Sequence, residues 1–224
     1  MRTLSSYTEN VSELRRILKT DLNFDIQEKT FLIGGRAASL FFIEGMVKDE
    51  ILEKLLEFFH DLKPEQMGNS LEDFQLQDFP YIEAEILTDY SPVLKNLLSG
   101  VSCLFVSGMP GCLAVDCRSY PARNVSEPQK DRTLRGSRDG FVETLVFNTA
   151  LLRRRIRSPE LRLEMEEVGS SSRTDIAICY MADRADMECL SHLKERISQI
   201  RIDAISMNQE SLAELLLPGH WYNP

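Results

Sequence analysis

Residues 127–156 read EPQKDRTLRGSRDGFVETLVFNTALLRRRI. The first part is polar and contains Pro128, which is typical of an exposed connection. Residues 135–140 then hold two glycines within six positions, and glycine permits backbone angles that other residues avoid, so we expect a shaped turn. From residue 141 onward, apolar residues recur with helical spacing and share one face: Phe141, Leu145, Leu152 and Ile156. The stretch therefore predicts a polar connection, a turn and a helix, in that order.

The longer run at residues 135–169, RGSRDGFVETLVFNTALLRRRIRSPELRLEMEEVG, resembles the signature of the GerA family. This family comprises the A subunits of bacterial spore germinant receptors and a close sporulation relative of that subunit. Its pattern reads approximately R-G-P-x-E-G-F-x-E, then an N-x-A-L-x-R-R-R-I helix, then a K-T-x-(apolar)-x-Y strand. The matching positions are Arg135, Gly136, Gly140, Phe141, Glu143, Asn148, Ala150, Leu151, Arg153 to Arg155, Ile156, Thr174 and Tyr180.

Two positions depart from the family pattern. Ser137 stands where the family usually has proline, and Asp139 stands where it usually has glutamate. Serine lacks the fixed φ of proline, so Ser137 loosens the turn. The similarity is specific over residues 127–183 and weaker over residues 25–62.

The resemblance implies a function. In the family, a soluble N-terminal domain is joined to a membrane-embedded half, so we expect this chain to be the soluble domain of a receptor A subunit, with membrane association through residues beyond it. The implied partners are the B and C subunits, other A subunits and a small nutrient ligand, in a complex at the spore inner membrane. The implied role is receptor assembly or signal transmission in nutrient-triggered spore germination.

Composition limits the other function classes. The chain has 224 residues, a net charge of −9 and a pI near 5.0, which argues against nucleic acid as the main partner because phosphate binding favours a basic surface. The first ten residues lack the apolar core of a signal peptide. No run approaches the ~20 apolar residues of a membrane-spanning helix.

Periodicity along the chain predicts the fold class α/β (α+β), with two small subdomains that contain mixed sheets and are joined by a polar linker. We expect the first subdomain at residues 1–120, the linker at 121–139 and the second subdomain at 140–224. In the first, two hairpins are predicted, at residues 25–43 around Gly34-Gly35 and at residues 101–117. Helices are expected at 11–19, 49–60 and 91–100, and an irregular segment at 62–80.

The second subdomain is predicted to hold the helix from Phe141, strands at 161–168 and 174–181, a helix after Asp186, a short strand at 204–205 and a last helix at 208–217. We expect the Phe141 helix to pack its apolar face on the sheet of this subdomain. Together with the turn at Arg135, the helix would hold the two subdomains in a fixed relation.

Signals for catalysis are weak. The chain has no nucleotide-binding glycine loop and no nucleophile-elbow motif, and its three histidines are scattered. Its five cysteines form no CxxC pair, and their odd number disfavours a disulfide framework. We therefore predict no enzyme activity, no metal, no cofactor and no disulfide.

The candidate binding or interface residues lie at the turn and on the following helix: Arg135, Gly136, Arg138, Asp139, Glu143, Asn148 and Arg154. The charged turn residues fit a contact between subdomains or subunits, because arginine makes directional bonds to carboxylates and carbonyls. An anion site at the helix N-terminus and a solvated turn are the alternatives. Asn148 is expected to make a structural hydrogen bond, and the arginines at 153–157 to form a solvated helix end or a subunit contact.

A second function, from another class, is a nutrient-binding module. Two α/β subdomains with a cleft between them suit small-molecule binding, because ligand sites often lie at domain interfaces.

Overall fold

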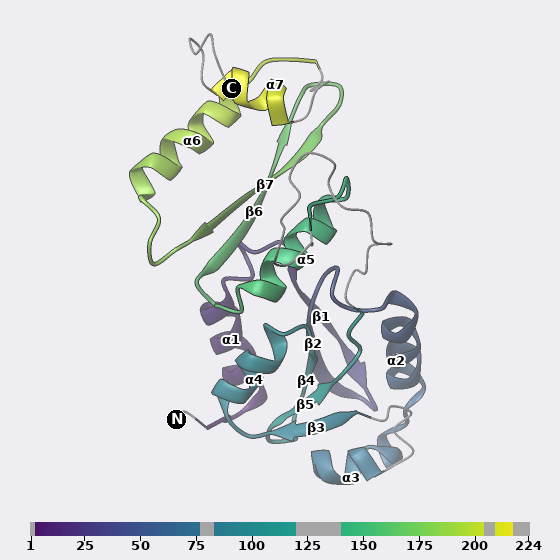
Figure 1. Cartoon of the computed structure of the whole chain (residues 1–224). Helices are drawn as coiled ribbons and strands as arrows, with labels where there is room; N and C mark the ends of the chain where they lie inside the picture. The colour runs from purple at the N-terminus through teal and green to yellow at the C-terminus, as the bar shows by residue number, and fades with distance from the viewer. Residues whose placement is uncertain (1–2, 77–82, 120–139, 204–208, 217–224) are drawn as a thin grey trace, which may run out of the picture. The chain divides into compact units, whose positions relative to one another are not determined.

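The computed structural model describes residues 3–76, 83–119, 140–203 and 209–216 (Figure 1). The chain divides into two compact units, Met1–Leu161 and Arg162–Pro224. The expected α+β class is confirmed. The predicted linker at 121–139 lies outside the described residues.

The first unit is built on a five-stranded sheet in the order β1-β2-β4-β5-β3. Its strands are β1 (Ile26–Ile33), β2 (Arg36–Ile43), β3 (Ala84–Leu87), β4 (Ser102–Val106) and β5 (Cys112–Val115). Both predicted hairpins are present, β1 with β2 and β4 with β5. Each pairing in this sheet is antiparallel, so the expectation of mixed sheets is corrected for this unit. Short hairpin connections impose this direction on the β1–β2 and β4–β5 pairs, because a parallel pair needs a long crossover.

The tight turn between β1 and β2 explains the two adjacent glycines. Gly34 and Gly35 have φ angles of 51° and 78°, and Ile33 pairs with Arg36 across them. A two-residue turn with positive φ at both central positions matches the natural twist of a hairpin.

The sequence prediction missed one strand. β3 has only four residues and lies at the edge of the sheet, paired with β5. The segment expected to be irregular, residues 62–80, holds a 3-10 turn (Pro64–Gln66) and the short helix α3 (Leu71–Leu76) in its described part. Such short elements carry too little periodicity to identify from sequence.

Helices cover both faces of the five-stranded sheet (Figure 1). α1 (Tyr7–Leu18) and α4 (Tyr90–Leu97) pack on one face, and α2 (Asp49–Asp61) and α3 pack on the other. β4 supplies both cores: Cys103 and Phe105 face α1 and α4, while Leu104 and Val106 face the opposite layer. Alternation along a strand sends neighbouring side chains to opposite faces, so a central strand covered twice is apolar throughout.

The second unit has a two-stranded sheet of β6 (Leu161–Val168) and β7 (Thr174–Met181), followed by α6 (Met187–Gln199) and α7 (Gln209–Leu216). Its small core contains Val168, Ile178, Leu190 and Ile197. Asp186 caps α6 as expected, accepting hydrogen bonds from the backbone of Glu188 and Cys189. The strand predicted at 204–205 lies outside the described residues.

Helix α5 (Leu145–Arg155) differs from its prediction in start, packing face and unit. It begins four residues after Phe141, whose side chain is 64% exposed. The residues it buries are Thr149, Ala150 and Arg153 rather than the expected apolar face. It also belongs to the first unit, because its buried side chains pack on and bond to elements of that unit.

Among the described helices, none has the length and apolar character needed to cross a bilayer.

Candidate functional site

The predicted site residues divide into two groups. Arg135, Gly136, Arg138 and Asp139 lie outside the described residues, so their interface role stays a prediction. Glu143, Asn148 and Arg154 are described, and the first and last of these have exposed side chains.

Asn148 makes the expected structural hydrogen bonds. Its Oδ1 accepts from the backbone N–H of Val142 at 2.7 Å, and its Nδ2 donates to the Val142 carbonyl at 2.7 Å. These two hydrogen bonds to the backbone of one residue fix the path of the chain into α5. An additional role for Asn148 in an interface stays a prediction.

One buried ion pair of the first unit was not among the predicted site residues. Arg153, the first arginine of the triple, is fully buried and pairs with Asp25, whose side chain is 1% exposed. Its Nε donates to Oδ2 at 2.8 Å and its Nη2 donates to Oδ1 at 3.0 Å. This two-point geometry uses both carboxylate oxygens and is the strongest form of an arginine–carboxylate pair.

The same guanidinium holds the chain that follows α5. Nη1 of Arg153 donates to the carbonyl oxygens of Ser158 at 3.3 Å and Leu161 at 3.1 Å. Leu161 is both the last residue of the first unit and the first residue of β6, which continues into the second unit. One side chain therefore fixes the start of β1, the end of α5 and the start of β6.

Local bonds hold Asp25 in position for this pair. The side chain of Asn23 donates to the Leu18 carbonyl at the end of α1, at 2.6 Å. The Asn23 carbonyl accepts from Ile26, and the Asp25 carbonyl accepts from Glu44 just after β2. The α1–β1 connection is thus tied to both α1 and β2, so the carboxylate is presented from a rigid part of the sheet.

A close approach of backbones seats α5 beside this pair. Gly45, in the turn after β2, has φ 77°, and a Cβ there would lie 2.9 Å from Cγ1 of Val146 and 3.2 Å from Cβ of Ala150. Ala150 packs with Ile43 and Met46 in a small cluster. Glycine at position 45 leaves the room that Val146 and Ala150 occupy.

The Arg153 guanidinium ties several segments of the chain together. Both charges face each other away from water, and four of the guanidinium's donor positions are directed at acceptors. The sequence held one usable signal: Thr149, Ala150 and Arg153 lie on one helical face, beside the apolar stripe rather than on it. The sequence predicts a solvated helix end or a subunit contact for these arginines, because charged residues are rarely buried within a unit.

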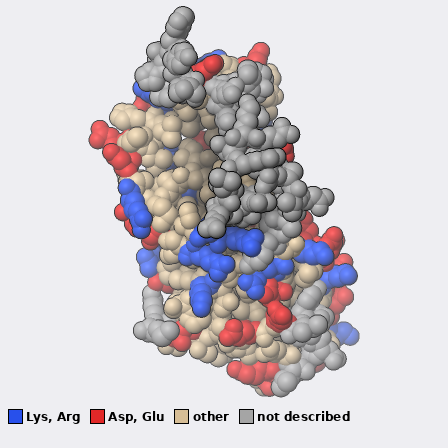
Figure 2. Space-filling model, viewed as in Figure 1, with Lys and Arg blue, Asp and Glu red and all other residues tan. Residues whose placement is uncertain are grey.

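The remaining arginines at this helix end are exposed, namely Arg154, Arg155 and Arg157. Figure 2 shows that Lys and Arg side chains gather near the middle of the face it displays, although the chain is acidic as a whole. Cations in the last turn of a helix interact favourably with the helix dipole. The prediction of a solvated end or a subunit contact therefore stays open for these three.

The second unit has a polar cluster of its own. Glu164 of β6 accepts hydrogen bonds from the hydroxyl of Tyr180 on β7 and from Nζ of Lys194 on α6. Lys194 also lies 5.9 Å from the centre of the Tyr180 ring. Burial and the bond to Glu164 raise the pKa of Tyr180 to about 12, so the phenol stays protonated. The cluster links both strands to α6.

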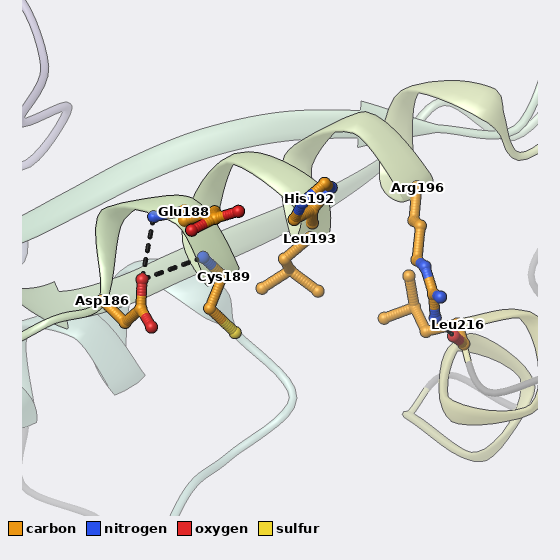
Figure 3. A pocket seen from close by; sticks show the side chains of 7 residues that line it. All are labelled: Asp186, Glu188, Cys189, His192, Leu193, Arg196 and Leu216. Atoms are coloured by element: carbon orange, nitrogen blue, oxygen red, sulfur yellow. Dashed lines mark hydrogen bonds between the residues drawn. The ribbon is translucent and has the colours of Figure 1, made fainter.

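A cavity of about 650 Å³ lies between α6 and α7. It is lined by Asp186, Glu188, Cys189, His192, Leu193, Arg196 and Leu216 (Figure 3). Two of its charged groups already have partners, because Asp186 caps α6 and Nη1 of Arg196 donates to the Leu216 carbonyl at 2.8 Å. The nutrient cleft predicted between the subdomains is a different location and stays a prediction.

Among the described residues, no group of three or more metal-ligating side chains converges. Their cysteines include no disulfide: Cys103, Cys112 and Cys117 are buried thiols, while Cys179 and Cys189 are exposed.

Comparison with known proteins gives one consistent family. Residues 12–224 match the profile of the Bacillus/Clostridium GerA spore germination protein. The chain is 31% identical over 207 residues to stage V sporulation protein AF of Bacillus subtilis, covering 90% of this chain and 41% of that protein. It is 28% identical to spore germination protein B1 of the same organism, covering 91% and 42%. The chain thus spans about two fifths of the length of these relatives.

A solved structure has the same fold. The crystal structure of the N-terminal domain of the A subunit of the Bacillus megaterium spore germinant receptor GerK3 superposes with a TM-score of 0.68. The two sequences are 24% identical, and the match covers 89% of this chain and 75% of the other. Together with the profile match over nearly the whole sequence, these likenesses lead to one conclusion: the chain belongs to the GerA family of spore germination proteins.

Proposed function

We propose that the chain serves as the N-terminal domain of a germinant receptor A subunit and transmits a signal, or supports assembly, during nutrient-triggered spore germination. In this proposal its partners are the B and C subunits, its place is the spore inner membrane, and its role is not enzymatic. The family and the fold of a receptor A-subunit domain support this role.

The observation that carries the proposal is the position of Arg153. Its guanidinium bonds the carboxylate of Asp25 at the edge of the first sheet and the carbonyl of Leu161, where the chain enters the second unit. A domain that passes conformational changes along its length needs a joint that couples its parts, and directional hydrogen bonds supply such coupling.

The test uses full-length receptor subunits in spores. Arg153→Ala should slow or abolish the nutrient response, while Arg16→Ala, at an exposed arginine of α1, should leave it near wild type. Protein level, and co-purification with the B and C subunits, should be measured in the same spores. A normal response from Arg153→Ala at normal subunit level would contradict the proposed coupling.

A further inference from the structure

We infer that α5 is a detachable helix of the first unit, and that the buried Arg153–Asp25 pair is the latch that holds it docked. Opening of this latch, with the five-stranded sheet intact, is the conformational change that the first unit makes. The opening itself follows from the contacts of the described residues. Its use in signalling rests on the function proposed above.

The first argument is which side chains of α5 are buried. α5 buries Thr149, Ala150 and Arg153, while Phe147 is 43% exposed and Ile156 is 37% exposed. Its apolar anchor is the small cluster of Ala150 with two residues near the end of β2. The other large apolar side chains of the helix, Leu145, Val146, Leu151 and Leu152, are half-buried rather than buried. Undocking would therefore expose less apolar surface than opening the five-stranded sheet, so the hydrophobic effect holds α5 less firmly than it holds that sheet.

The second argument is the nature of the latch. Two charges taken out of water lose hydration, and their mutual attraction only repays that loss when the geometry is good. If the pair separates, both ions regain water, which lowers the free energy of the open state. An apolar anchor of the same size has no such compensation, so an ion pair is suited to a contact that opens and closes reversibly.

The third argument is what the opening releases. The guanidinium that leaves Asp25 also gives up the carbonyls of Ser158 and Leu161. β6 begins at Leu161, so the start of that strand is freed in the same event. One latch thus controls both the seat of α5 and the chain leading into the second unit.

Hydrogen exchange on the 224-residue chain tests the latch. Amides of α5 should exchange faster than those of β4 and β5 in the wild type, because they open locally. Asp25→Asn should accelerate exchange in α5 on the order of 100-fold, since it leaves the buried arginine without a counter-charge. Its effect on β4 and β5 should be small. Arg154→Ala is the matched control and should change α5 by less than about threefold.

A second variant separates the latch from general stability. The double substitution Asp25→Leu with Arg153→Met replaces the charges by apolar side chains of similar size and should restore protection in α5. If Asp25→Asn instead accelerates β4, β5 and α5 by the same factor, the pair stabilises the whole unit and the latch inference is wrong. The same conclusion follows if wild-type α5 exchanges as slowly as β4.

Spores that carry the full-length subunit test the signalling role. The apolar double variant should be present at normal level and respond less to nutrients, because its α5 stays docked. A normal response, combined with the expected exchange pattern, would overturn the use of the latch in signalling while leaving the latch in place. Loss of response in the Arg153→Ala spores together with uniform exchange would support the proposed function and overturn the latch.

Discussion

The five-stranded sheet and helix α5 belong to the same unit but are held by opposite means. The sheet buries apolar side chains on both faces under four helices. α5 leaves its large apolar side chains half-buried or exposed and buries an arginine that pairs with an aspartate. Apolar burial is non-directional and tolerates many geometries, whereas a two-point ion pair fixes one geometry. The difference indicates a stable scaffold that carries one conditionally attached element.

Phe41→Ala should have the largest effect on this comparison. Phe41 is fully buried and packs edge-on against Phe105, with ring centroids 6.0 Å apart. Truncation should lower the free energy of unfolding by about 3–5 kcal/mol, through lost burial and a cavity. Chemical denaturation measures this change. A loss below about 1 kcal/mol would mean that the sheet core repacks, and that apolar burial does not distinguish it from α5.

Gly45→Ala should act on the seat of α5. The backbone has φ 77°, and the added Cβ would meet Val146 at 2.9 Å. We expect a loss of about 1–3 kcal/mol from strain and crowding. Gly35→Ala is the control, because Gly35 has φ 78° but open space around it. Equal losses from the two variants would mean that backbone strain alone is felt and that the contact with α5 contributes nothing.

Phe141→Ala should have a small effect, in contrast to Phe41→Ala. The side chain is 64% exposed, so its removal should change the free energy of unfolding by less than about 0.5 kcal/mol. The sequence places Phe141 on the packed face of a helix, and truncation of a buried phenylalanine would cost about 3–5 kcal/mol. Denaturation under the conditions used for Phe41→Ala decides between the two, and a loss near that of Phe41→Ala would contradict the exposed position.

In the second unit, the Tyr180 phenol should titrate at a raised pH. Its pKa is raised to about 12 by burial and by the bond to Glu164. A raised pKa means that the folded state holds the proton more tightly, so the stabilisation is complete below pH ~10 and is lost between pH ~10 and ~12. The ultraviolet absorbance of the phenolate follows this titration. Glu164→Gln should lower the pKa of Tyr180, and an unchanged value would assign the shift to burial alone.

Elements whose signal is local were predicted well. The Gly34-Gly35 hairpin, the apolar β4–β5 hairpin and the capped helix after Asp186 all depend on residues within a few positions of one another. The edge strand β3 was harder to predict. β3 has four residues, and its pairing with β5 is set by the chain around it rather than by its own pattern.

The candidate site divides in the same way. The sequence predicts a structural hydrogen bond for Asn148, and its partner is the backbone of Val142, six residues earlier, which the sequence did not indicate. Arg154 is among the predicted site residues, whereas the structure buries Arg153. The sequence could not distinguish the two, because adjacent arginines in a helix differ only in the face on which they lie. That face is selected by Asp25, which lies 128 positions away.

The sequence by itself determined the secondary structure of most of the chain, the acidic character and the family, because these depend on composition, short-range periodicity and a contiguous motif. Only the tertiary structure decided that α5 belongs to the first unit, that Phe141 is exposed and that one arginine of three is buried. The physical reason is that burial of a charge depends on a counter-charge brought from elsewhere in the chain. Apolar periodicity cannot report that partner, since it records only which face of a helix is apolar and not what the other faces contact.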